Sequence, residues 1–437
     1  MRPALALLVS MILPPFLAVA QDRDTKVRND REAFETSDDW IYNDLDAGIE
    51  AARVSGKPLM VVFRCIPCEA CQEFDDDVAR RDPIIRDLLD RFVCVRIVQA
   101  NDIDLMRFQF DFDQSFAVIL MNPDFTIYGR YGTRSDRPEY DDISLSGLRK
   151  AMEAALQMHQ DFPAVKASLA GKQVRQSRYA TPRDYPSLAG KYETRIDYEG
   201  QVARSCMHCH QVREAERLVF RTAGEPIPDA VLYPYPDPSV LGLKLEPTEK
   251  ATIEQLAADS IADRAGLRVG DAITTLDGQP LVSIADLQWV LHNTADSAQL
   301  PVQILRDGQP LDLTLELPEG WRRGNISWRV TTWELRRMAL GGMVLDELAD
   351  ADRAAAGLPN DTLALRVRRV GEYGEHATAK RAGIRAGDII TSFNGLTDRR
   401  SESSLLAHTV QHSRPGDSAP ITLLRDGKEL QLTLPLQ

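Results

Sequence analysis

The sequence predicts a multidomain chain with an α/β domain, a small mainly helical segment and two similar α+β domains. Three observations predict this architecture: an apolar strand pattern that leads into a cysteine cluster, a second cysteine pair in a polar stretch, and a duplication in the C-terminal half. A length of 437 residues fits several domains. The net charge of −13 comes without a long basic run, which argues against nucleic acid as a partner.

Residues 1–20 have the composition of a secretory signal peptide. One positive charge precedes an apolar run over residues 4–20, which ends in Ala18-Val19-Ala20, a small-x-small cleavage sequence. The run falls short of the roughly 20 residues of a membrane span and contains Pro14-Pro15. We therefore expect a periplasmic or otherwise extracytoplasmic protein that begins near Gln21 and has no membrane span after cleavage.

Residues 38–170 have the pattern of an α/β domain. The short apolar run 59–63 is rich in β-branched residues and is typical of a buried strand. It leads directly into Cys65-Ile66-Pro67-Cys68-Glu69-Ala70-Cys71. Further strands are expected over 92–98 and 116–121.

At these residues the chain resembles the thioredoxin-like fold, in which a buried strand delivers a Cys-x-x-Cys pair to a helix N-terminus that lowers the thiol pKa. The resemblance implies a catalytic site in which Cys68 attacks, Cys71 resolves and Cys65 is an extra thiol. A second register pairs Cys65 with Cys68, because Pro67 stands before Cys68. Thioredoxins carry a cis-proline where this chain has Ser115-Phe116, so a metal held by the three thiols is a further interpretation.

The segment 171–239 is polar and contains Cys206-Met207-His208-Cys209-His210. Cys-x-x-Cys-His is the attachment sequence of c-type haem, in which two thiols bond to the vinyl groups and the histidine ligates the iron. The sequence therefore predicts one covalent haem c on Cys206, Cys209 and His210. A zinc site that also uses His208 is the alternative.

Three single residues complete the candidates of the first half. His159 and Met158 are weak candidates for the distal haem ligand, and an open sixth position is equally compatible with the sequence. Cys94 lies at the centre of a predicted strand, and we expect it to be a small buried hydrophobic residue.

The C-terminal half is duplicated. Residues 265–273 (AGLRVGDAI) match residues 382–390 (AGIRAGDII), and a Leu-Arg-Asp-Gly sequence follows each copy, at 305–308 and 424–427. The offset is longer than a solenoid repeat, so the copies are two domains. We expect these domains at 240–318 and 341–437, joined by a linker over 319–340.

The repeated pattern resembles bacterial PDZ domains, which add an extended peptide to an exposed sheet edge. The resemblance implies that the first domain binds a protein or peptide C-terminus, whose carboxylate meets backbone amides of Leu241-Gly242-Leu243. In the second domain Leu340-Gly341-Gly342-Met343 is looser and an insertion follows over 346–362, so its peptide binding is left open. We expect the tryptophans of the linker to be docking anchors between domains: Trp321, Trp328 and Trp333.

The order of the motifs resembles a bacterial family of exported thioredoxin-like/PDZ (seleno)proteins. That resemblance implies an extracytoplasmic redox protein in which the cysteine site performs thiol–disulfide exchange or electron transfer, the haem carries electrons, and the PDZ domains hold a protein partner. A redox partner protein is then expected as well. The alternative is a non-enzymatic haem-containing PDZ adaptor or a redox or gas sensor. Because neither Gly-x-Ser-x-Gly nor His-Glu-x-x-His occurs, we expect no protease.

Overall fold

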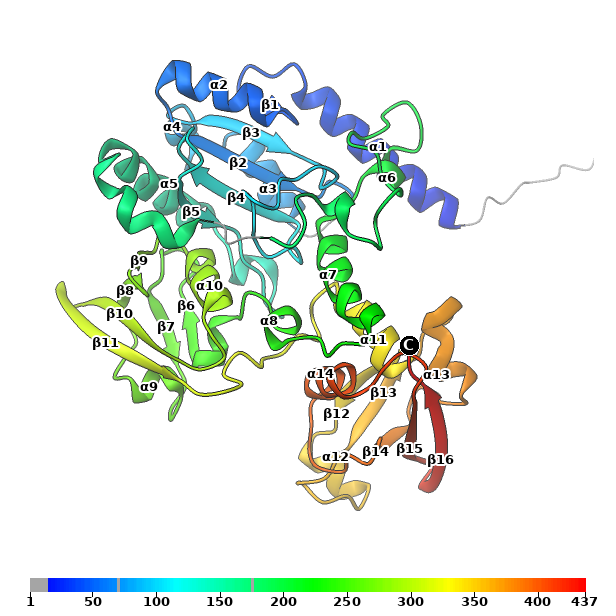
Figure 1. Cartoon of the computed structure of the whole chain (residues 1–437). Coiled ribbons are helices and arrows are strands. Elements are labelled where there is room, and N and C mark those ends of the chain that lie inside the picture. The colour runs from blue at the N-terminus through cyan, green and yellow to red at the C-terminus, as the bar shows by residue number, and fades with distance from the viewer. Residues whose placement is uncertain (1–14, 69–70, 174–176) are drawn as a thin grey trace, which may run out of the picture.

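An N-terminal helix, a mixed five-stranded sheet, a helical segment and two further β-rich domains follow one another along the chain (Figure 1). The computed structural model describes residues 15–68, 71–173 and 177–437. Helix α1 (Pro15–Phe34) runs through the predicted cleavage point before Gln21, and its Val27 is buried. Within the described ranges, no helix combines the length and the apolar character that crossing a bilayer requires.

The first sheet is built around a strand that is buried on both faces. Its order is β1 (Ile41–Tyr42), β3 (Val93–Ile97), β2 (Leu59–Arg64), β4 (Phe116–Met121) and β5 (Ile127–Tyr131). Strands β1, β3 and β2 are parallel, whereas β4 and β5 are antiparallel to their neighbours. Every residue of β2 is buried, which explains why its sequence is continuously apolar rather than alternating. The three predicted strands are confirmed.

Helices cover both faces of this sheet. Met60 and Val62 of β2 pack toward α3 (Gln72–Ala79), α4 (Arg86–Leu89) and α5 (Leu145–Gln160), with the 3-10 turn η1 (Glu139–Asp141) before α5. Val61 and Phe63 point to the opposite face, toward α2 (Leu45–Ser55) and α7 (Cys209–Ala223). Since α7 belongs to the segment 171–239, that segment completes the core of the first domain.

The regular elements among the described residues of segment 171–239 are helices, joined by long irregular stretches, so the segment is less helical than expected. Its elements are the end of η2 (Ala164–Lys172), η3 (Pro182–Asp184), α6 (Val202–Ser205), α7 and α8 (Asp229–Leu232). Val212 and Ala215 of α7 are buried in the same cluster as β2 and β4. The polar composition of the segment therefore hides one strongly apolar helix face that is covered by the sheet.

The third domain is held by two sheets. It contains η4 (Pro238–Leu241), β6 (Leu243–Leu245), β7 (Ile253–Leu256), α9 (Ile261–Arg264), β8 (Ala272–Leu276), β9 (Gln279–Pro280), α10 (Ile284–Asn293), β10 (Ala298–Arg306) and β11 (Gln309–Leu317). The larger sheet has the order β11-β10-β8-β9, and β6 pairs with β7. Trp321, from the predicted linker, is buried in this core and donates from Nε1 to the Ala295 carbonyl at 2.9 Å.

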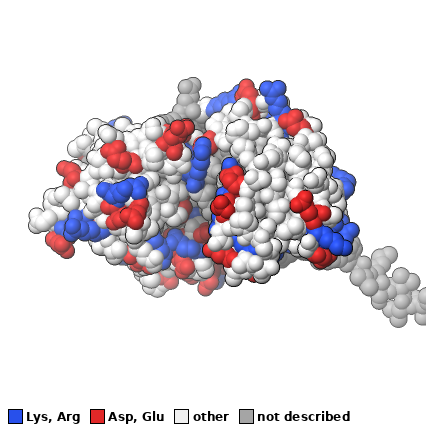
Figure 2. All heavy atoms as spheres, turned by 90° about the horizontal axis from the view of Figure 1, so that it is seen from below, with Lys and Arg blue, Asp and Glu red and all other residues white. Residues whose placement is uncertain are grey.

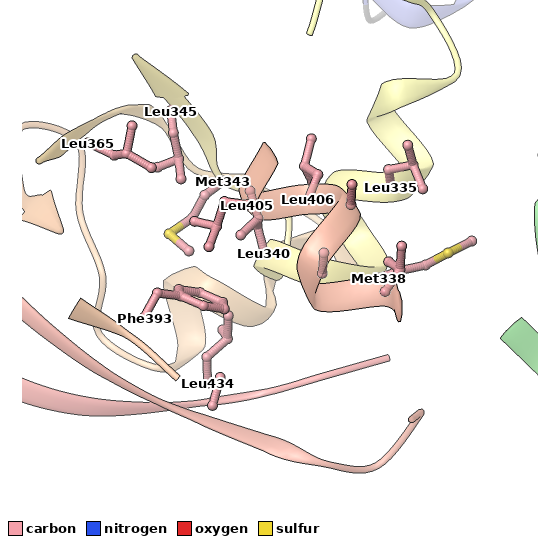
Figure 3. Packing of buried hydrophobic residues seen from close by; sticks show 14 of the residues in the cluster. Leu335, Met338, Leu340, Met343, Leu345, Leu365, Phe393, Leu405, Leu406 and Leu434 are labelled. Atoms are coloured by element: carbon pink, nitrogen blue, oxygen red, sulfur yellow. The ribbon is translucent and has the colours of Figure 1, made fainter. Parts of the chain in front are cut away.

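The fourth domain has one five-stranded sheet, in the order β12-β13-β14-β15-β16. Its elements are α11 (Thr332–Leu340), β12 (Val344–Glu347), α12 (Asp350–Ala355), β13 (Leu365–Arg369), η5 (Gly374–Ala377), α13 (Thr378–Arg381), β14 (Ile389–Phe393), α14 (Glu402–His412), β15 (Ser418–Arg425) and β16 (Lys428–Pro435). Figure 3 shows Leu335 and Met338 of α11 beside Leu405 and Leu406 of α14. Helix α11, which lies within the predicted linker, is therefore part of this core.

The duplicated motif has one structural purpose in both copies. Arg306 of the first Arg-Asp-Gly turn contacts Asp271 at 2.8 Å and donates to the Gly266 carbonyl at 2.7 Å. Arg425 contacts Asp388 at 2.7 Å and donates to the Gly383 carbonyl at 2.8 Å. The two halves of the sequence repeat therefore bind each other, which is why both halves persist in each copy.

The third domain docks on the first through the N-terminal half of α10. The Asp286 carboxylate accepts from the Arg130 backbone N–H at 3.0 Å and from Lys172 Nζ at 2.5 Å. A Cβ on Gly129 would lie 2.1 Å from Val282, so the strand β5 needs a glycine at this contact. Acidic and basic side chains are interspersed on the face shown in Figure 2, so on this face the net negative charge is spread out.

Removal of one arginine of the repeat is expected to loosen only its own domain. Arg306→Ala deletes the charge-assisted hydrogen bonds to Asp271 and the hydrogen bond to the Gly266 carbonyl, so we expect the third domain to lose local stability. Hydrogen–deuterium exchange followed by mass spectrometry should show faster exchange in β8 and β10 and no change in β14 and β15. Arg425→Ala is the matched control and should reverse this pattern. Equal changes in both domains would contradict the assignment.

Candidate functional site

The predicted cysteine motif follows β2 and forms a turn rather than a helix start at Cys68. Cys65 is 8% exposed, Cys68 is half-buried and Cys71 is buried. The Cys68 N–H donates to the Cys65 carbonyl at 3.1 Å, and α3 begins only after Cys71. Residues 69 and 70 of the motif lie outside the described ranges. Of the three thiols, that of Cys71 comes nearest in sequence to the helix N-terminus.

Arg64 fixes the backbone of this turn. Its guanidinium donates to the carbonyls of Cys65 and Cys68 at 2.5 and 2.9 Å. It also forms an ion pair with Asp75 of α3 at 3.1 Å, and both side chains are buried. The Cys65 N–H donates to the Ser115 carbonyl at 3.0 Å, at the position where thioredoxins carry their cis-proline. The turn is therefore held in one conformation from both sides.

The second cysteine motif lies directly against the first. Cys65 Sγ lies 2.9 Å from His208 Nδ1. Two backbone hydrogen bonds of Met207 hold the second motif against the residues that follow β3. The Met207 N–H donates to Asn101 Oδ1 at 2.7 Å, and its carbonyl accepts from the Ala100 N–H at 3.1 Å. Cys206 Sγ donates to the Val98 carbonyl at 3.5 Å. Two motifs that are far apart in the sequence thus form one site at the end of β3.

Burial keeps this site uncharged. Burial first, and then the neighbouring Cys68, raise the pKa of the Cys65 thiol to about 12. Burial, with a smaller contribution from His210, lowers the pKa of His208 to about 4. At neutral pH the contact therefore joins a thiol to a neutral imidazole. Burial and then the Cys65 charge raise the pKa of both Cys206 and Cys209, so the thiols of the two motifs lie within electrostatic reach of each other.

The structure separates Cys71 and Cys94 from this site. Cys71 packs with Phe74 in the cluster on the α3 side of the sheet, whereas Cys209 packs on the α7 side. Cys94 is buried, and its Sγ lies 3.8 Å from the Leu89 carbonyl. Burial raises the pKa of Cys94 to about 12, in agreement with the expected small hydrophobic role.

The cysteines of the Cys-x-x-Cys-His motif do not fit a covalent haem. Cys206 and Cys209 are 2% and 9% exposed, and they belong to two different packed clusters. None of five cavities among the described residues, of about 50 to about 570 Å³, is lined by either thiol or by His210. His210 Nδ1 instead pairs with Glu214 at 3.0 Å along α7. Both thiols therefore lie in packed side-chain clusters and not at the wall of any of these five cavities.

The predicted distal ligands are not near this motif. His159 lies on α5, where Nδ1 contacts the Tyr128 hydroxyl at 2.8 Å and Nε2 contacts the Gly56 carbonyl at 2.9 Å. Met158 packs into the cluster of the α3 face, opposite to Cys209. In the part of the chain that the structure describes, no three His, Cys, Asp or Glu side chains form a group that could hold a metal ion.

Sequence reasoning missed the Cys65–His208 contact. The sequence indicates His208 only as an alternative zinc ligand, and no pattern in it points to Asn101. The available signal was the presence of two Cys-x-x-Cys motifs in one chain, at 65–68 and 206–209. Their proximity depends on the docking of α7, which no local pattern reveals.

The predicted peptide site of the third domain has an open sheet edge. Leu241 and Leu243 are buried, and Gly242 has φ +85°. A Cβ on Gly242 would lie 2.1 Å from Ser260 Cβ, so only glycine fits. Strand β6 pairs with β7 on one edge, and among the described residues no strand pairs with its other edge.

In the fourth domain one backbone donor at the equivalent edge is occupied by a side chain. Gly342 has φ +86°, and its carbonyl accepts from the Gly371 N–H at 3.0 Å, as that of Gly242 accepts from Ala257 at 2.8 Å. However, the Leu345 N–H of β12 donates to Glu402 Oε1 of α14 at 2.8 Å. Glu402 is also paired with Arg336 at 2.6 Å. The protein's own carboxylate thus occupies a backbone donor of this strand.

Comparison with known proteins agrees with this division of the chain. A family model described as thioredoxin-like matches residues 40–123. A PDZ domain model matches residues 239–317 and 374–436. The chain carries a thioredoxin-like domain and two PDZ domains. These matches give no evidence for a haem-containing or a selenoprotein family.

Several curated relatives that match part of the chain are named periplasmic serine endoproteases. A probable periplasmic serine endoprotease DegP-like of Pseudomonas savastanoi pv. phaseolicola is 28% identical over 191 residues, which cover 43% of this chain and 37% of the relative. The periplasmic serine endoprotease DegP of Escherichia coli K12 is 32% identical over 77 residues, 18% of this chain and 16% of the relative. The chain spans less than two fifths of the length of these relatives.

Solved structures give partial matches of the same kind. The HtrA-type protease AlgW with decapeptide shares 18% identity and a TM-score of 0.21, and the match covers 33% of this chain and 50% of that chain. The serine endoprotease from Yersinia pestis shares 24% identity and a TM-score of 0.17, over 18% of this chain and 28% of that chain.

These comparisons overturn two predictions from the sequence. We expected an extracytoplasmic haem redox protein, or a haem-containing adaptor or sensor, and the relatives are instead named serine endoproteases. The haem, iron and electron-transfer roles are therefore wrong, and no finding supports a redox partner. The expectation of no protease is also wrong. Its physical weakness is that Gly-x-Ser-x-Gly marks one hydrolase fold only, whereas a Ser-His-Asp triad occurs with other local sequences.

The reduced, folded protein should be alkylated first at Cys68. Cys68 is half-buried, whereas burial raises the pKa of Cys65 to about 12, which leaves about a thousandfold less thiolate at pH 8 than an ordinary thiol has. Iodoacetamide labelling followed by peptide mass spectrometry measures the order. Cys94, with an equally raised pKa, is the buried control. Labelling of Cys65 at the rate of Cys68 would contradict this assignment.

Proposed function

We propose that this chain binds polypeptide segments in the periplasm through its first PDZ domain and serves proteolytic protein quality control. The observation that carries the proposal is the unpaired edge of β6 beside Gly242. The names of the periplasmic endoprotease relatives support the compartment and the class of ligand. Export by a cleaved signal peptide over residues 1–20 is part of the proposal.

The binding step follows from the geometry of a sheet edge. An extended peptide that lies along β6 gains backbone hydrogen bonds that the strand does not make within the chain. Gly242, in the left-handed region, joins η4 to β6, and its N–H donates to the Ser239 carbonyl at 2.9 Å. We expect the terminal carboxylate of a bound peptide to lie beside this turn, with apolar side chains against Leu241 and Leu243.

The two PDZ domains differ at one position that decides which edge is open. The first residue of α14 is Glu402, which accepts from the Leu345 N–H of β12. The first residue of α10 is Ile284, which has no carboxylate to accept a hydrogen bond from β6. We therefore assign peptide binding to the first domain and a structural role to the second.

Fluorescence polarisation of the full chain with a labelled decapeptide tests the proposal. The probe ends in an apolar residue with a free carboxylate, and we expect saturable binding that falls at least tenfold, or about 1.4 kcal/mol, for the C-terminal amide. Gly242→Val should cause a similar loss because its side chain meets Ser260. Glu402→Gln, which alters only the second domain, is the matched control and should keep the binding of the first.

A change in the peptide makes the test independent of protein folding. N-methylation of alternate backbone amides removes the strand hydrogen bonds without altering the protein, and should abolish binding. Equal affinity for the methylated and unmodified peptides would refute edge binding. Mass spectrometry of the same samples reports any cleavage of the probe, which would make the chain itself an endoprotease.

A further inference from the structure

We infer that Cys206 and Cys209 are cross-linking thiols rather than haem-attachment thiols, and that one of them forms a disulfide with Cys65 in the exported protein. This bond would join the turn after β2 to the segment before α7. The inference concerns the thioredoxin-like domain and does not depend on peptide binding by the first PDZ domain.

The contacts around Met207 bring the two cysteine motifs together without help from the thiols. Asn101 is fully buried, and its side chain accepts from the Met207 N–H and donates to the carbonyls of Ser205 and Glu193 at 2.8 and 2.9 Å. His208, between the two cysteines of its motif, then meets Cys65 Sγ at 2.9 Å. Cys65 is therefore presented to the second motif by a preformed interface.

Packing places further groups of the two motifs in contact. Ile66, the residue after Cys65, packs against the cluster that contains Cys206. Cys209 lies in the cluster of Phe63, two residues before Cys65. Both cysteines of the second motif thus border the turn that carries Cys65, one on each side of Met207.

The environment favours a disulfide over the other uses of paired cysteines. The thiols of Cys206 and Cys209 are enclosed by side chains and line none of the five cavities among the described residues. An exported compartment is oxidising, and disulfides persist there. A bond between positions so far apart in sequence removes much chain entropy from the unfolded state, so it adds to a docking that already rests on the polar contacts of Met207 and on the buried apolar face of α7.

The reaction is an ordinary thiol–disulfide exchange with a disulfide oxidant, such as glutathione disulfide in vitro or a protein disulfide in the compartment. Cys65 loses its proton to a base in solution and attacks the oxidant as the thiolate, which forms a mixed disulfide and releases one glutathione thiol. Because burial raises the pKa of Cys65, this step is slow at neutral pH. Cys206 or Cys209 then loses a proton, attacks the Cys65 sulfur and releases the second thiol. Two protein thiols and one glutathione disulfide yield one protein disulfide and two glutathione thiols, so atoms and electrons balance.

The full chain, exported from a host that also attaches c-type haem, provides the test. Cells are quenched in acid, free thiols are alkylated, and the protein is digested with trypsin without reduction. Trypsin releases residues 65–80 with three cysteines and residues 205–213 with two. We expect these two peptides to be linked, with fragmentation placing the bond at Cys65.

Other products overturn the inference. These are a disulfide within 65–80 or within 205–213, a bond through Cys68 or Cys71, full alkylation, or a haem mass on 205–213. Cys65→Ser should abolish the linked peptide, and Cys94→Ser, another buried thiol, should retain it as the matched control.

The role of His208 as a positioning residue has its own readout. After reduction, His208→Gln should slow linkage by glutathione disulfide roughly tenfold or more between pH 6 and 8, because the contact that orients Cys65 Sγ toward the second motif is lost. An unchanged rate would leave His208 without this role. Reduction should lower the melting temperature of the wild type and leave that of Cys65→Ser unchanged, which separates a failed cross-link from a misfolded variant.

Discussion

The arrangement of the domains depends on one buried arginine. Arg329, from the connection between the PDZ domains, pairs with Asp111 and Asp113 of the thioredoxin-like domain at 2.7 and 3.0 Å. Its other nitrogen donates to the Pro234 carbonyl at 2.7 Å. Burial alone would raise the pKa of Asp113, but Arg329 and then Arg217 lower it overall. Because a buried charge without its partner is costly, these three segments are fixed relative to one another or not docked at all.

The same constraint positions the cysteine site. Arg217 of α7 is fully buried and donates to the Thr331 hydroxyl at 2.8 Å, and the Thr331 N–H donates to Asp113 at 3.0 Å. Helix α7 is thereby tied at its middle to the connection and at its start, through Met207, to Asn101. These two attachments fix the position of α7 along the sheet. His208, which lies just before α7, is thereby placed against Cys65. The cysteine contact is thus a consequence of polar interactions that lie outside the site.

Local patterns predicted what is locally determined. The run 59–63 is continuously apolar because the strand is covered on both faces, and the repeated Ala-Gly and Arg-Asp-Gly sequences mark domains because Arg306 and Asp271 bind each other. The haem prediction from the Cys-x-x-Cys-His motif was wrong because the motif shows only which side chains are present. What those groups meet is decided by Asn101 and by the apolar face of α7, and both act over long sequence distances. Docking through Asp286 was unpredictable for the same reason, since its partners, Lys172 and the Arg130 backbone, lie in another domain.

Comparison of the two PDZ domains shows why β6 of the first domain can accept a peptide along its edge. Both copies keep a left-handed glycine whose carbonyl accepts from the following strand, at Gly242 and Gly342. A single side chain then separates them: Glu402 reaches the β12 backbone and is neutralised by Arg336, whereas Ile284 leaves β6 without an internal acceptor. An unpaired edge is a liability in a folded protein unless something binds it. The difference between the two copies at this edge therefore agrees with peptide binding at β6 in the first domain.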